Sequence, residues 1–352
     1  MIGSGAATRG PGTMDAPRRP FPASAASRSL AVPEPHVVTV GGPLPASALG
    51  IVDSHDHLFI SSPALAGGEI EDPERVIAEV RDAKATGIGT IVELTPIGLG
   101  RRPDLMRRVS AETGVAVIAA TGFHRDAHYP AGHWVHDAPL DLLTRRMLAD
   151  LTGGMHPSDW IGEGSPDPAL AGAIKLGASY QRISQGERRR LEAGAAASAA
   201  SGAAIVVHTE IGTCGDEIVD ALLAGGAAAD RIVLAHMDRN PDLELHAEIA
   251  ARGVWLVYDT IGRIKYRPES VLLDLVEGMV REGHGDRIVL GLDLGVRDYF
   301  RSYGGGPGMR TLMASFVPRL RRRIGDGATD AMLISNPAQV FAIAESRTVP
   351  SA

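Results

Sequence analysis

The sequence is poor in cysteine, in aromatic side chains and in basic charge. Its 352 residues include one cysteine, Cys214, which excludes an intramolecular disulfide and leaves the redox compartment unconstrained. Aromatic residues make up 4% of the chain, and the formal net charge is −7. A negative chain argues against general binding of nucleic acid, which needs a basic face. The most apolar-looking stretch, residues 191–207, is rich in alanine and interrupted by serine and glycine. We therefore expect no nucleic-acid partner, no membrane partner and, by default, a cytoplasmic location.

What the sequence does contain is enough apolar material for a large core. Hydrophobic residues make up 44% of the chain, and the mean hydropathy is +0.02. One α/β barrel domain can run to this length. Residues 1–35 are rich in alanine, serine, proline and glycine, so we expect a disordered extension there. Arg18 and Arg19 mimic a twin-arginine signal, but no apolar segment follows them. We place one barrel domain at residues 36–346 and a flexible tail at residues 347–352.

After residue 36, short β-branched runs alternate with amphipathic stretches of helical period. The expected strands are residues 49–55, 89–95, 115–122, 172–177, 203–209, 231–237, 254–260 and 287–293. The expected helices are residues 73–87, 103–114, 139–154, 185–202, 215–226, 241–253, 268–285 and 309–325. Strict alternation implies parallel strands, and eight such units predict a single-domain α/β fold, the closed (β/α)8 or TIM barrel.

Polar side chains collect where these strands end. In the stretch VDSHDHLFI, His55 and His57 stand two residues apart and would face the same side of a strand. Four more polar residues end the fourth, fifth, sixth and eighth strands: Lys175, His208, His236 and Asp293. Active sites of this fold lie at the carboxyl ends of the strands, so we expect the six side chains to meet at one mouth of the barrel.

Four histidines and one aspartate offer more ligands than one metal ion needs. A catalytic zinc-type site usually has three protein ligands, so two ions that share a bridging ligand fit this set better. A buried lysine near cations has a depressed pKa, and its neutral amine can react with carbon dioxide to give a bridging carbamate. Each of these residues, taken alone, has another interpretation. A lone histidine is commonly a hydrogen-bonded core residue, and Lys175 could snorkel or form a Schiff base. All six together favour a metal site.

The order of these residues resembles the amidohydrolase superfamily and, more narrowly, the phosphotriesterase family. The matching segments are DSHDHLFI, AATGFH, AGAIKLG, VVHTEIG, LAHMDRN, LGLDLG, YGGGPG and SNPAQVF. The similarity covers roughly residues 36–345. Members commonly carry glutamate between the first two histidines. This chain has Asp56 there, on the opposite side of the strand, where we expect no effect on metal binding.

The resemblance implies a centre of two divalent metal ions. It assigns one ion to His55, His57 and Asp293, and the other to His208 and His236. It also implies that Lys175, as N6-carboxylysine, bridges both ions together with a hydroxide. Zinc is the expected metal, and manganese, iron and cobalt accept the same ligands. In the implied mechanism the hydroxide attacks the substrate, and Asp293 is the catalytic residue that accepts its proton and delivers it to the leaving group.

The loops after the seventh and eighth strands carry what information there is about the substrate. Barrels often bind phosphate there. The candidate substrate-binding residues in these loops are Arg263, Lys265, Tyr266 and Arg297. The resemblance to sugar-lactone hydrolases implies that Lys265 and Arg297 hold an anionic group. The alternative is that these cations only solvate the loops.

These observations predict a metal-dependent hydrolase, first of all a lactonase that acts on small sugar lactones, including phosphorylated ones. An amidase of small N-acyl acids and a promiscuous phosphotriesterase are the enzymatic alternatives. A triester pocket would be wide and aromatic, and this chain is poor in aromatic residues. A metal-binding barrel without catalysis is the alternative outside enzymes. The expected partner is a small molecule, and if the chain assembles, we expect a homodimer.

Overall fold

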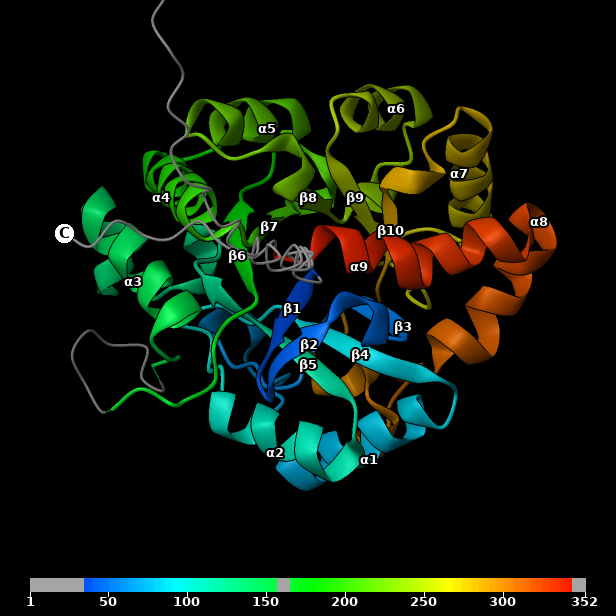
Figure 1. Ribbon diagram of the computed structural model, residues 1–352, viewed down its shortest axis with the longest axis horizontal. Coiled ribbons are helices and arrows are strands. Elements are labelled where there is room, and N and C mark those ends of the chain that lie inside the picture. The colour runs from blue at the N-terminus through cyan, green and yellow to red at the C-terminus, as the bar shows by residue number, and fades with distance from the viewer. Residues whose placement is uncertain (1–34, 157–164, 344–352) are drawn as a thin grey trace, which may run out of the picture. The chain divides into compact units, whose positions relative to one another are not determined.

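The computed structural model describes residues 35–156 and 165–343, and its eight parallel strands confirm the predicted barrel (Figure 1). The strands are β3 (Ile51–Asp56), β4 (Ile88–Glu93), β5 (Ala116–Gly122), β6 (Ala173–Ala178), β7 (Ala204–Thr209), β8 (Ile232–Ala235), β9 (Trp255–Tyr258) and β10 (Ile288–Leu290). Neighbours pair in chain order from β3 to β10. The N–H groups of Leu292 and Asp293 donate to the carbonyl of His55, which joins the last strand to the first. Apart from residue 35, the predicted extension and the predicted tail lie outside the described residues.

Helices α1 to α7 lie between successive strands, and α8 and α9 follow the last strand. They are α1 (Pro73–Lys84), α2 (Pro103–Thr113), α3 (Leu140–Thr152), α4 (Gln185–Ser201), α5 (Gly215–Ala224), α6 (Leu243–Ala251), α7 (Glu269–Arg281), α8 (Val317–Asp330) and α9 (Asn336–Val340). The prediction that the last helix ends at Gly325 is wrong. Gly325, at φ 81°, interrupts α8, and the helix continues beyond it to Asp330. Within the described ranges, no helix combines the length and the apolar character that a membrane span needs.

Side chains of the strands alternate between the barrel interior and the surrounding helices. In β6, Ala173 packs inside the barrel, whereas Ile174 and Leu176 pack in the layer under the helices. In β9, Trp255 and Val257 lie inside and Leu256 and Tyr258 outside. Because side chains repeat every two residues, Lys175 and Asp259 continue these inner rows at the carboxyl ends of β6 and of the chain after β9.

An antiparallel hairpin that the sequence did not predict precedes the barrel. It consists of β1 (His36–Thr39) and β2 (Gly42–Pro45). Val37 is fully buried among the inner side chains at the starts of the strands, together with Val340 and Phe341. In Figure 1 the hairpin and α9 lie over one end of the barrel. The amino-terminal end of the barrel is therefore filled by apolar side chains, and the carboxyl ends of the strands are left for polar ones.

Candidate metal centre

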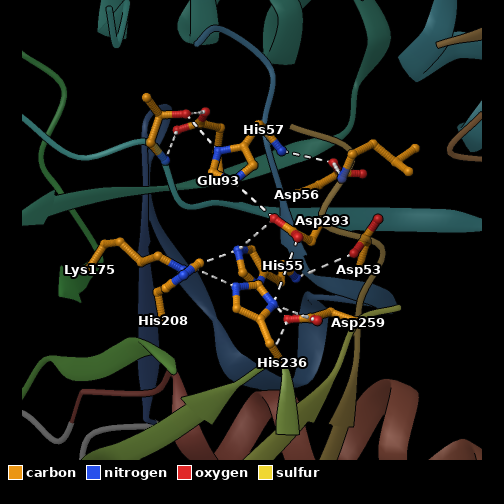
Figure 2. Close-up of polar contacts among 12 residues, drawn as sticks. Asp53, His55, Asp56, His57, Glu93, Lys175, His208, His236, Asp259 and Asp293 are labelled. Atoms are coloured by element: carbon orange, nitrogen blue, oxygen red, sulfur yellow. Dashed lines mark hydrogen bonds and ion pairs between the residues drawn. The ribbon is translucent and has the colours of Figure 1, made fainter. Parts of the chain in front are cut away.

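The six predicted ligands meet at the carboxyl ends of the strands (Figure 2). Lys175 Nζ lies 3.1 Å from His55 Nε2, and His236 Nε2 lies 2.8 Å from His208 Nδ1. Asp293 Oδ1 lies 3.3 Å from His57 Nε2 and 3.5 Å from His55 Nε2. Within the described residues, ligand atoms of His55, His236 and Asp293 lie within 4.8 Å of one another, close enough to hold one ion. The sequence therefore identified residues that the fold brings together.

Two of these residues depend on an unusual backbone conformation. His236 has φ 64° and Asp293 has φ 51°, both in the left-handed region. His236 directly follows Ala235, an inner residue of β8, so a continued strand would turn its side chain outward. The left-handed turn brings the imidazole back to the inside of the barrel. Non-glycine residues in this region are uncommon, and they cluster at functional sites.

Asp259, which is not among the predicted ligands, fixes two of the imidazoles. Its Oδ2 lies 2.7 Å from His55 Nδ1, and its Oδ1 lies 2.8 Å from His236 Nδ1. Burial acts to raise the pKa of Asp259, but the two imidazoles hold it well below its usual value. An ionised carboxylate only accepts hydrogen bonds, so both Nδ1 atoms carry the proton. Both Nε2 atoms therefore present a lone pair to the centre.

The other two imidazoles each have their own acceptor. Thr95 Oγ1 donates to Glu93 Oε1 at 2.5 Å, so it accepts from His57 Nδ1 at 2.9 Å. Glu210 Oε2 lies 2.7 Å from His208 Nε2, and this hydrogen bond lowers the pKa of Glu210 to about 2. Carboxylates and hydroxyls in this position orient the histidine ligands of metal ions and fix their tautomers. All four rings thus have one nitrogen occupied and the other turned to the centre.

The donor set fits divalent cations. Burial lowers the pKa of His55 and of His208 to about 4, and that of His236 well below its usual value, so these rings are neutral near pH 7. The facing nitrogens of His208 and His236 then present two lone pairs 2.8 Å apart, which is favourable only around a cation. Burial also lowers the pKa of Lys175 to about 8. A larger fraction of the neutral amine, the form that reacts with carbon dioxide, is present as a result.

Two arginines hold the remaining predicted ligand, Asp293. Its Oδ2 accepts from Arg239 Nη2 at 2.6 Å and from Arg263 Nη1 at 2.8 Å. Burial acts to raise the pKa of Asp293, but Arg263 and the neighbouring histidines keep it well below its usual value. The carboxylate is therefore ionised, with Oδ1 toward the histidines and Oδ2 toward the arginines.

A cavity of about 250 Å³ opens over this cluster. One side of it is formed by Arg239, Arg263 and Lys265, which we call the cationic wall. The ring of Tyr266 lies among these cations, with its centre 4.4 Å from the Arg239 guanidinium and 5.1 Å from Lys265 Nζ. The lining also includes His124, Arg125, His128 and Glu210. Three of the four predicted substrate-binding residues, Arg263, Lys265 and Tyr266, therefore line one cavity. The fourth, Arg297, is exposed, and the cavity lining does not include it.

Asp56 lies outside the ring cluster. Its Oδ1 accepts from the backbone N–H groups of His57 and Leu294, so it ties β3 to the loop after β10. Asp259, Thr95 and Glu210 did carry a sequence signal. Each stands within one residue of the end of a predicted strand, and the six predicted ligands stand within two residues of such an end. Arg239, three residues after His236, carried no such signal.

Comparisons with known proteins agree with this geometry. The model of the phosphotriesterase family matches residues 35–341. A protein of Mycoplasmopsis agalactiae named phospho-furanose lactonase is 34% identical over 330 residues, which cover 88% of this chain and 92% of that protein. The crystal structure of an amidohydrolase from Mycoplasma synoviae superposes with a TM-score of 0.85 at 30% identity, covering 89% of this chain and 94% of that one. A lactonase from Listeria monocytogenes superposes with a TM-score of 0.81 at 26% identity, covering 88% of this chain and all of that one.

Proposed function

Because the chain belongs to the phosphotriesterase family and is a hydrolase, we propose that it is a lactonase that opens small sugar lactones bearing an anionic group, such as phosphate. The observation that carries this proposal is the cationic wall beside the histidine cluster. The name of the Mycoplasmopsis agalactiae relative, phospho-furanose lactonase, supports the same substrate class.

The charge of the cavity favours an anion. Its lining contains four cations, Arg125, Arg239, Arg263 and Lys265, and two carboxylates, Glu210 and Asp293. The carboxylates are paired: Glu210 contacts Arg125, and Asp293 contacts Arg239 and Arg263. Four cations against two carboxylates leave a surplus of two positive charges. Lys265 is the cation best placed for a substrate because it is exposed and its described contacts are with the Tyr266 and Tyr299 rings.

The proposed cofactor is a pair of divalent ions, with zinc first. His55, His57 and Asp293 would hold one ion, and His208 and His236 the other, with carboxylated Lys175 between them. Bound ions would supply a water of lowered pKa and would polarise the carbonyl of the lactone. Thr95, Asp259 and Glu210 would keep the imidazole nitrogens pointed at the ions.

The chain's own residues have separate roles in the proposed reaction. Lys265 holds the anionic group at the rim, which fixes the lactone ring over the histidine cluster. Asp293 accepts the proton of the attacking water on its carboxylate and returns it to the ring oxygen when the carbon–oxygen bond breaks. Arg239 and Arg263 keep that carboxylate ionised and fixed in direction before the proton arrives.

A substrate panel tests the proposal. The zinc-loaded protein would be assayed with a phosphorylated furanose lactone, the same lactone without phosphate, an N-acyl amino acid and an aryl phosphotriester. We expect kcat/KM to be highest for the phosphorylated lactone, with the neutral lactone about tenfold to a hundredfold lower. A higher kcat/KM on the N-acyl acid, the triester or the neutral lactone would overturn the assignment of the substrate.

A further inference from the structure

We infer that Asp259 couples the two halves of the metal centre, because one carboxylate orients one imidazole from each proposed ion. The inference rests on the two-ion assignment of the proposed function. It makes Asp259 a positioning residue shared by both ions, and it predicts that neither ion binds independently of the other.

Both oxygens of Asp259 are occupied within the barrel. Oδ2 receives the Nδ1–H of His55 at 2.7 Å and the backbone N–H of His236 at 3.3 Å. Oδ1 receives the Nδ1–H of His236 at 2.8 Å. Asp259 is fully buried, and Arg263 Nη2 donates to its backbone carbonyl at 2.5 Å. Figure 2 shows Asp259 on one side of the two rings and Lys175 on the other.

The other orienting groups act on one ring each. Thr95 contacts His57, and Glu210 contacts His208. Among the described residues, Asp259 therefore differs from both because its two contacts belong to different proposed ions. When one ion fixes His55, Asp259 is held in place, and His236 is already aligned for the other ion. Binding of the second ion then costs less conformational freedom of the His236 side chain, which gives positive coupling between the two sites.

The arrangement predicts unequal effects for two substitutions. In Asp259→Asn, the side chain keeps one acceptor oxygen. The Oδ2 position faces two donors, so the amide oxygen takes that position and the amide nitrogen faces His236 Nδ1. His236 must then accept there and carry its proton on Nε2, where the second ion would bind. Asp259→Asn should mainly weaken the ion at His208 and His236, whereas Asp259→Ala should weaken both ions.

Zinc binding provides the test, with Thr95→Val as the matched control because it removes one acceptor from one imidazole. Zinc content per chain would be measured for the wild type and the variants as a chelator lowers free zinc. We expect two zinc ions in the wild type and weakening of both by about tenfold to a hundredfold in Asp259→Ala. In Thr95→Val we expect mainly the ion at His57 to be weakened, with a smaller loss at the other ion that the coupling transmits. Fewer than two ions in the wild type would refute the two-ion proposal itself. Two ions in the wild type with one or none weakened in Asp259→Ala would refute the coupling by Asp259.

A second readout covers the case in which Asp259→Ala fails to fold. Nitrogen-15 spectra of the metal-free wild type should show two strongly deshielded Nδ1–H signals from imidazoles that donate to a carboxylate. The isosteric Asp259→Asn variant should lose the signal of His236 and keep that of His55 in a weaker hydrogen bond. Retention of both signals, or loss of both, would overturn the inference whatever the zinc content.

Discussion

The floor and the rim of the cavity are built in different ways. The floor consists of buried or nearly buried side chains at or just beyond the strand ends: His55, His57, Lys175, His208, His236 and Asp293. The rim consists of the remaining residues of the loops after β7, β8, β9 and β10, where Lys265 is exposed and the adjacent Ile264 is 73% exposed. Hydrogen bonds between strands and buried acceptors fix the floor, while contacts between loop side chains form the rim. Loops of this kind vary readily on a fixed scaffold.

The difference predicts different consequences for function. A change in the floor should reduce turnover of every substrate, because it disturbs groups that any hydrolysis at this site would need. A change in the rim should alter the choice among substrates and leave the reaction itself intact.

The largest effect is expected for Lys175→Ala. The substitution removes the proposed bridge between the ions, so we expect zinc to be lost together with activity on all lactones, by at least about a thousandfold in kcat/KM. Partial recovery with a short carboxylic acid would support the role of a carbamate. Zinc content and kcat/KM measured on the same preparations check the prediction, and a fully active variant would contradict it.

Asp293→Asn should separate metal binding from catalysis. An amide oxygen can still face the ions but cannot accept a proton, so we expect most of the zinc to remain while kcat falls by about a hundredfold to ten-thousandfold. The loss should be similar for charged and neutral lactones because Asp293 acts on the breaking bond. Near-normal kcat would show that this carboxylate is not the proton acceptor.

Lys265→Ala should change selectivity at the rim. We expect kcat/KM to fall by about tenfold to a hundredfold for the phosphorylated lactone, and by less than about threefold for the neutral lactone. Arg267→Ala is the matched control, because Arg267 is an exposed cation of the same loop that does not line the cavity. Arg297→Ala tests the remaining prediction for the anion site. If Lys265→Ala lowered kcat/KM equally for both lactones, the rim would not determine substrate choice separately from the floor.

The smallest effect concerns the stability of the metal-free protein. The folded-state pKa of His55 and of His208 is about 4, below the value of about 6.5 in an unfolded chain. The unfolded chain therefore binds more protons at these two rings as the pH falls, and their contribution to stability is lost between pH 6.5 and about 4. Asp53 and Asp238, whose pKa values burial raises to about 7 and about 6, act in the opposite direction in this window, so the two rings are best followed directly. We expect the NMR signals of both imidazoles in the folded, metal-free protein to remain those of neutral rings from pH 7 to pH 5, and a titration of either ring near pH 6.5 would contradict the account.

Much of the floor could be predicted from the sequence because strand periodicity places strand ends together. His55, Lys175 and His208 stand at the ends of regular apolar runs, and the barrel brings such ends to one face. Asp259 was missed although it stands one residue before the end of the seventh predicted strand. An aspartate after a strand is also a common turn residue, and its two partners lie 204 and 23 positions away in the chain. Only the closed barrel shows that one carboxylate reaches both.

The rim could be predicted less well, since loop conformation does not follow from periodicity. Arg297 and Lys265 were equivalent by sequence, but Lys265 lines the cavity and Arg297 is exposed away from its lining. Arg239 was overlooked because a short helical turn after His236 brings its guanidinium back onto Asp293. The hairpin at residues 36–45 was missed because its prolines and glycines are typical of loops.

Anomalous diffraction from crystals of the zinc-loaded protein tests the central claim most directly. It would show the ions and the chemical state of Lys175 in the same map. We predict two zinc peaks per chain, one at His55, His57 and Asp293 and one at His208 and His236, with a carboxylated Lys175 between them. A single zinc peak beside an unmodified Lys175 amine, in protein that hydrolyses lactones at full rate, would contradict the account.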